Sequence, residues 1–95
     1  MADVLHDPEH KRFALETDAG LAHLDYILTD ALLVLSHTEV PVGAEGQGVG
    51  SRLAKAGLDH ARAEGLRVMP LCPFVAAYVR RHPEERDLLM AGVSV

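Results

Sequence analysis

A glycine-rich turn runs directly into the start of an amphipathic helix within residues 40–53, and this junction constrains the fold more than any other part of the chain. Gly46, Gly48 and Gly50 allow the backbone to adopt positive φ angles and to approach a ligand closely. The first-turn N–H groups of the helix have no partner within the helix, and the helix dipole favours an anion. The sequence therefore predicts a cradle for a phosphate group at residues 46–51.

The segment before this turn is typical of an antiparallel meander. Residues 13–17 partly alternate between apolar and polar side chains, a turn follows at residues 18–20, and residues 21–28 alternate loosely. The run at residues 31–38 begins with continuous apolar side chains, which predicts a central strand covered on both faces. Residues 1–12 are polar and are expected to form a lead-in that becomes ordered at Phe13.

Beyond the turn, apolar residues recur at spacings of three and four, and Gly65 is expected to end this helix. Residues 66–71 indicate a short strand, which a crossover helix places parallel to the third strand. A helix over residues 74–81 and a helical turn or two at 84–89 complete the chain. The expected fold class is α/β (α+β), an antiparallel meander plus a parallel crossover strand with two to three helices, in a single domain over residues 13–95.

Composition excludes several classes of function. The 95 residues, 48% of them hydrophobic, suit one small core, and the net charge of −5 argues against a nucleic-acid partner. The single cysteine, Cys72, allows no internal disulfide, which predicts a reducing, cytoplasmic location. We expect no membrane span and no signal peptide, because no uncharged apolar stretch reaches about 18 residues. The histidines form no convincing metal-binding constellation, so no metal is expected.

Four motifs occur in a fixed order along residues 13–89: His37-Thr38-Glu39-Val40-Pro41, Gly46-Gln47-Gly48-Val49-Gly50, Pro70-Leu71-Cys72 and Arg81-His82-Pro83-Glu84. With these motifs the chain resembles the GNAT superfamily of N-acetyltransferases, and more closely its minimal acetyltransferase-like family. The resemblance implies direct transfer of an acetyl group from acetyl-CoA to an amine, with protein or peptide amines as candidate acceptors. It leaves the acceptor itself and the oligomeric state open. The cofactor-binding residues that it implies are Val40, Gly46, Gln47, Gly48, Val49, Gly50, Ser51 and Arg52.

The chain departs from the superfamily pattern at one position of the loop. The usual sequence is Gln/Arg-x-x-Gly-x-Gly/Ala, and here Glu45 occupies the place of the Gln or Arg. A carboxylate close to a diphosphate is repulsive, although Arg52 or Lys55 could offset it. Two other functions therefore stay open: an acyl-CoA binding module without catalytic activity, and a scaffold that presents its sheet to a protein partner.

Candidate catalytic groups lie on both sides of the loop. The resemblance implies that the N–H of Val40 polarises the thioester carbonyl. Tyr78 is a candidate general acid or, alternatively, a core aromatic residue. Cys72 is a candidate for an acetyl-cysteine intermediate or for a simple contact, and otherwise a small buried hydrophobic residue. His37 and Glu39 share one face of a strand and together could accept the proton of the amine, while a structural pair is the alternative.

Overall fold

Residues 3–95 are described by a computed structural model, and within them one five-stranded sheet has the strand order β1-β2-β3-β4-β5. The strands are β1 (Leu5–Asp7), β2 (Arg12–Thr17), β3 (Gly20–Thr29), β4 (Leu32–Glu39) and β5 (Arg67–Pro70). The helices are α1 (Val49–Glu64) and α2 (Pro73–Arg81), with short 3-10 helices η1 (Val42–Ala44) and η2 (Pro83–Leu88). Strands β1 to β4 pair antiparallel, and β5 pairs parallel with β4. The predicted α/β fold, a meander with a parallel crossover strand, is confirmed.

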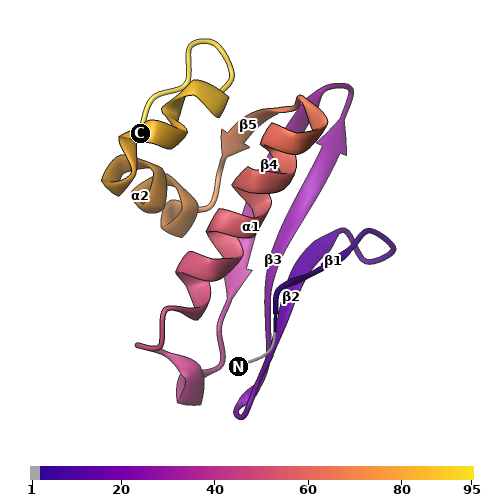
Figure 1. The fold of residues 1–95 in the computed structure, drawn as a ribbon, viewed down its shortest axis with the longest axis vertical. Coiled ribbons are helices and arrows are strands. Elements are labelled where there is room, and N and C mark those ends of the chain that lie inside the picture. Colours follow the sequence, from indigo (N-terminus) through magenta and orange to yellow (C-terminus); the bar gives the residue numbers. More distant parts are fainter. Residues whose placement is uncertain (1–2) are drawn as a thin grey trace.

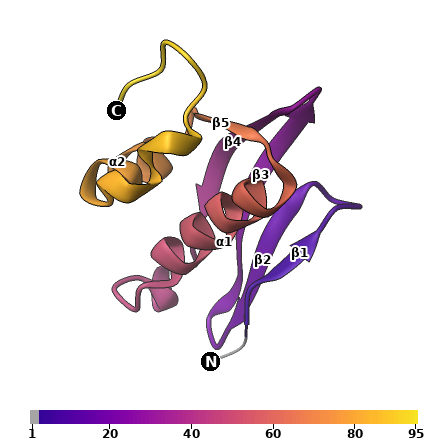
Figure 2. The same cartoon turned by 45° about the horizontal axis from the view of Figure 1, so that its top comes forward.

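Helix α1 lies diagonally across one face of the sheet, and α2 packs beside it against β4 and β5 (Figures 1 and 2). The side chains beneath α1 alternate along the strands, so that Leu24 and Leu35 are fully buried. Gly57 faces both of them, and a Cβ there would lie 3.2 Å from Leu24 and 3.3 Å from Leu35. The missing side chain at Gly57 therefore lets α1 approach the sheet closely, and Gly65 ends the helix in a left-handed conformation with φ of 69°.

The other face of the sheet has no helix over it among the described residues, so the expectation that residues 31–38 are covered on both faces is wrong. Val34 is only partly buried, and Ile27, opposite it on β3, is exposed. Met69 lies beside Val34 on β5 and is also only partly buried. We call this surface, which carries Asp25, Ile27, Val34 and Met69, the open face.

Strand β1 lies within the stretch for which the sequence predicted a polar lead-in. Its edge pairing places His6 opposite Phe13, with the two rings stacked at a centroid distance of 4.7 Å. The Nε2 atom of His6 lies 2.7 Å from the hydroxyl of Tyr26, and its ring lies 4.4 Å from that of His60. A histidine thus anchors this strand, whose leucine, Leu5, is exposed.

The anchoring histidine should make the stability of the fold dependent on pH. Burial lowers the pKa of His6 below its ordinary value of 6.5, the charge of His60 lowers it further, and Asp7 and Glu64 raise it to a smaller extent. Because the folded state binds this proton less readily, His6 contributes stability that is present above its ordinary pKa and is lost as the pH falls. We expect the Tm to fall by a few degrees from about pH 7 to about pH 5.

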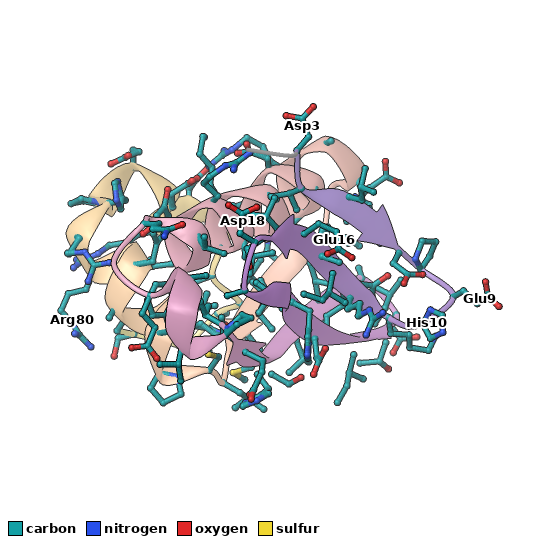
Figure 3. The ribbon with its side chains drawn as sticks, turned by 90° about the horizontal axis from the view of Figure 1, so that it is seen from below. Asp3, Glu9, His10, Glu16, Asp18 and Arg80 are labelled. Carbon is teal, nitrogen blue, oxygen red and sulfur yellow. The ribbon has the colours of Figure 1, made fainter. Side chains whose placement is uncertain are left out.

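Calorimetry across this pH range checks the prediction. The variant His6→Phe should flatten the pH dependence, since phenylalanine stacks but does not titrate. His10→Gln is the control, because His10 points outward at the β1–β2 turn, at the far end of the molecule from Arg80 of α2 (Figure 3). Equal pH dependence in the wild type and His6→Phe would contradict a role for His6.

Candidate functional site

A bulge in β4 decides which side chains reach the candidate site. In the pairing with β3, His37 lies opposite Asp25 while Leu35 lies opposite Tyr26, so Ser36 is an extra residue. The hydroxyl of Ser36 donates a hydrogen bond to the backbone carbonyl of Asp25, with a donor–acceptor distance of 3.1 Å. An extra residue reverses the alternation of side chains along the strand beyond it.

Because of this reversal, Thr38 lies opposite Leu24 on the helix-covered face, whereas His37 and Glu39 lie on the open face. Their side chains are 60% and 61% exposed, and His37 Nε2 lies 2.7 Å from Glu39 Oε2. The predicted sharing of one face by His37 and Glu39 is therefore seen in the structure. Without the bulge, both side chains would point toward the helices.

The parallel strands β4 and β5 separate at the bulge. Leu35 is the last residue of β4 that pairs with β5, opposite Pro70, and its carbonyl also accepts a hydrogen bond from the N–H of Cys72 at 3.0 Å. Beyond this point β4 continues to Glu39, while the chain after β5 turns into α2. The Sγ of Cys72 lies 3.2 Å from the Oγ1 of Thr38, a contact that bridges the separated strand ends.

A groove of about 540 Å³ opens where these strands separate. It runs from the end of β4 past the glycine turn and the first turn of α1 to α2. Its lining residues are Thr38, Glu39, Val40, Ala44, Glu45, Gly46, Gly48, Val49, Gly50, Ser51, Phe74 and Arg81. Since Thr38 and Glu39 belong to opposite faces, the groove reaches the edge of β4 from both sides of the sheet.

The glycine turn presents backbone to this groove. Gly46 and Gly48 have φ angles of 80° and 76°, a region that other residues rarely adopt, and a Cβ on either would meet no atom within 4 Å. The N–H of Arg52 donates to the carbonyl of Gly48 at 3.0 Å, which is the hydrogen bond that begins α1. The preceding N–H groups, at residues 49–51, are first-turn donors at the positive end of the helix dipole. The geometry suits an anion.

Comparison with known proteins gives the family. The sequence model of the GCN5-related N-acetyl-transferase family matches residues 12–88. The chain belongs to the GCN5-related N-acetyltransferase (GNAT) family. Protein NATD1 of Mus musculus is 31% identical over 84 residues, which cover 84% of this chain and 76% of that protein. NATD1 of Homo sapiens is also 31% identical, with coverage of 84% and 74%. The NMR solution structure of a GCN5-like protein from Staphylococcus aureus has the same fold, with a TM-score of 0.68, 24% identity, and coverage of 93% of this chain and 87% of that chain.

This GNAT domain brings most of the residues expected around the cofactor to one groove. Val40, Gly46, Gly48, Val49, Gly50 and Ser51 all line it. Gln47 and Arg52 are not among the lining residues, because Gln47 is exposed at the tip of the turn and Arg52 lies further along α1. Glu39 lines the groove, and His37 reaches it only through Glu39.

The other two catalytic candidates lie beneath the surface. Cys72, 4% exposed, is linked to the groove through Thr38. Tyr78 does not reach the groove: it is 5% exposed and stacks on His82 with ring centroids 4.1 Å apart. Burial raises the pKa of Tyr78, while the charge of Lys55 lowers it to a smaller extent. Tyr78 thus lies outside the lining of the groove, whereas Thr38 and Glu39 belong to it.

Phe74 and Thr38 line the groove of this GNAT domain, although the sequence indicated no functional role for either. Phe74 lies over the first turn of α1, where a Cβ on Gly50 would be 2.7 Å from its Cζ atom. Phe74 lies at the start of α2 and lines the groove, whereas Tyr78, further along the same helix, is buried. Thr38 lies on the other face of β4 from His37 and Glu39, the helix-covered face, where its hydroxyl contacts Cys72.

The charges around the groove are mixed. Glu45 and Arg81 both line it, from the turn and from α2 respectively. Lys55, one of the two cations that could offset Glu45, forms an ion pair with Asp59 at 3.3 Å. Within residues 3–95 no group of three or more His, Cys, Asp or Glu side chains is placed to hold a metal ion. No helix in this part of the chain is long and apolar enough to cross a membrane.

Proposed function

We propose that this GNAT domain binds acetyl-CoA in the groove and transfers its acetyl group directly to an amine. The observation that carries the proposal is the glycine turn at Gly46 and Gly48, which opens onto the groove beside the first turn of α1. Backbone N–H groups at residues 49–51 would hold the pyrophosphate, and the open space beside both glycines leaves room for it. The groove then leads to Val40 at the end of β4, where the thioester would lie.

At that end the chain supplies a donor and a proton acceptor. The N–H of Val40 would donate to the thioester carbonyl, and Pro41, which has no N–H, ends the strand there. Acetyl-CoA supplies an activated acetyl carbon, which bonds to the amine nitrogen as its bond to sulfur breaks. Glu39, supported by His37, would take the proton that the amine nitrogen loses. The leaving sulfur gains one proton, for which the Thr38 hydroxyl is a candidate donor, since Thr38 lines the groove and its Oγ1 lies 3.2 Å from the Sγ of Cys72.

A binding module without catalysis is the second candidate function. It is favoured by the carboxylate of Glu45, which lines the groove, and by the position of Tyr78 outside the groove lining. Calorimetry with acetyl-CoA followed by thiol release on a panel of amines separates the two functions. Heat of binding with no thiol release would support the module, and no heat of binding would contradict both.

Glu45 provides a test of the binding mode. Glu45→Arg should bind acetyl-CoA about 10-fold more tightly, because two units of charge change beside the pyrophosphate at about 1 kcal/mol or less each. The gain should shrink at high salt, since exposed charges are screened. Calorimetry checks this against Glu9→Arg, which makes the same change of net charge at the far end of the molecule (Figure 3). An equal gain in both variants would show only a long-range charge effect.

We further propose that Tyr78 packs the fold and delivers no proton. Tyr78→Phe removes only the hydroxyl, so the ring stack on His82 should persist and kcat should change by less than about twofold. Removal of a general acid would instead lower kcat by about 100-fold or more. Steady-state kinetics decides between these outcomes, with the Tm of the same sample recorded to exclude unfolding.

A further inference from the structure

A second pair of imidazole and carboxylate groups stands next to the one already described. His23 and Asp25 lie on β3, with His23 Nδ1 2.8 Å from Asp25 Oδ1. In the register of the two strands His23 is opposite Glu39, and Asp25 is opposite His37. Opposite residues of an antiparallel pair have Cβ atoms about 5 Å apart, so the four side chains form one compact group on the open face.

This group is accessible and negatively charged. The side chains of His23 and Asp25 are 23% and 39% exposed, and those of the neighbouring pair are more exposed still. With neutral imidazoles the four residues carry two negative charges. The cation that faces Asp25 from the other side is Arg12 of β2, and its Nε lies 3.4 Å from the carboxylate of Asp7. Asp7 therefore competes with Asp25 for the charge of Arg12, and the net charge of the four-residue group stays negative.

The group is also continuous with the groove. Glu39 belongs to both, since it lines the groove and lies opposite His23. Further along the open face, Ile27, Val34 and Met69 form an apolar row across three strands. The open face thus offers negative charge beside the place where the thioester would lie and apolar surface beyond it.

We infer that the open face receives an acceptor bearing an alkylammonium group, such as the end of a lysine side chain, and that Asp25 selects for its positive charge. This inference rests on the proposed acetyl transfer. Charge complementarity carries it: a cation gains from two carboxylates, an uncharged arylamine does not, and an anionic acceptor is repelled. On arrival one N–H bond of the ammonium breaks, and its proton passes through Glu39 to solvent. The neutral amine that remains is the nucleophile, and Glu39, ionised again, takes the second proton that the nitrogen loses as it bonds to the acetyl carbon.

Binding can be measured without turnover. Amide chemical shifts are followed by NMR during titration with n-butylamine, which is a cation at neutral pH, and with n-butanol as the uncharged probe. With the amine, the shifts should concentrate at residues 23–25 and 37–40, and Asp25→Asn should weaken the affinity at least threefold. The control is Asp30→Asn, an equal change of charge at the β3–β4 turn, where Asp30 has a positive φ of 50° that asparagine also tolerates.

Kinetics gives the second readout. If acetyl transfer occurs, Asp25→Asn should raise the KM for n-butylamine about fivefold with kcat little changed, and leave the KM for aniline unchanged. Localised binding without acetyl transfer would support the docking face and contradict the proposed enzyme. Acetyl transfer with equal preference for aniline, or shifts that are scattered or identical for both probes, would overturn the inference and leave the enzyme proposal standing.

Discussion

Gly48→Val should abolish measurable binding of acetyl-CoA, with a loss of affinity of about 100-fold or more. Gly48, the N-cap residue of α1, has a φ of 76°, and a β-branched side chain is costly in this region by about 1–2 kcal/mol. Gly48 also lines the groove, and an added Cβ would meet no protein atom within 4 Å, so a side chain there would occupy space next to the place where the pyrophosphate is expected. Calorimetry with acetyl-CoA measures the loss.

The structure offers a matched control for backbone strain. Gly92 has a φ of 84°, and a Cβ on it would likewise meet nothing within 4 Å, but Gly92 does not line the groove. Gly92→Val should therefore lower the Tm about as much as Gly48→Val and bind acetyl-CoA like the wild type. Unchanged affinity in Gly48→Val would contradict a phosphate-binding turn at residues 46–51. An equal loss of affinity in both variants would show that backbone strain causes the effect.

Features encoded by local sequence could be predicted. The turn at Gly46 and Gly48 and the helix from residue 49 depend on glycine conformation and on a period of 3.6, both of which are properties of neighbouring residues. The meander followed from alternation and turn residues. The end of α1 at Gly65 followed from the glycine that takes a left-handed conformation there.

Features that depend on distant contacts could not be predicted. Strand β1 is held by His6 against partners on β2, β3 and α1, none of which is near it in sequence. The bulge at Ser36 exists only in the pairing with β3, and it decides that Glu39 reaches the open face. That Phe74 lines the groove while Tyr78 is buried depends on how α2 packs against α1, which helical spacing alone does not specify.

Glu39→Gln should lower kcat/KM for an alkylamine by about 100-fold, because the proton of the nucleophile loses its acceptor next to the groove. The amide keeps the shape of the side chain, so the fold should be unaffected. Glu16→Gln is the matched control: it removes a carboxylate from the exposed part of β2 (Figure 3) and should leave kcat/KM within about twofold. Steady-state kinetics over a range of pH measures both variants.

The division of the loss between kcat and KM identifies what Glu39 does. Removal of a base lowers kcat, whereas removal of a charge that only attracts the cation raises KM. His37→Ala should lower kcat less than Glu39→Gln, since His37 contacts Glu39 at 2.7 Å but does not line the groove. His10→Ala controls for loss of an exposed imidazole that is paired with a carboxylate. If Glu39→Gln raised KM alone while His37→Ala abolished kcat, His37 would be the base and Glu39 the residue that draws the amine toward it.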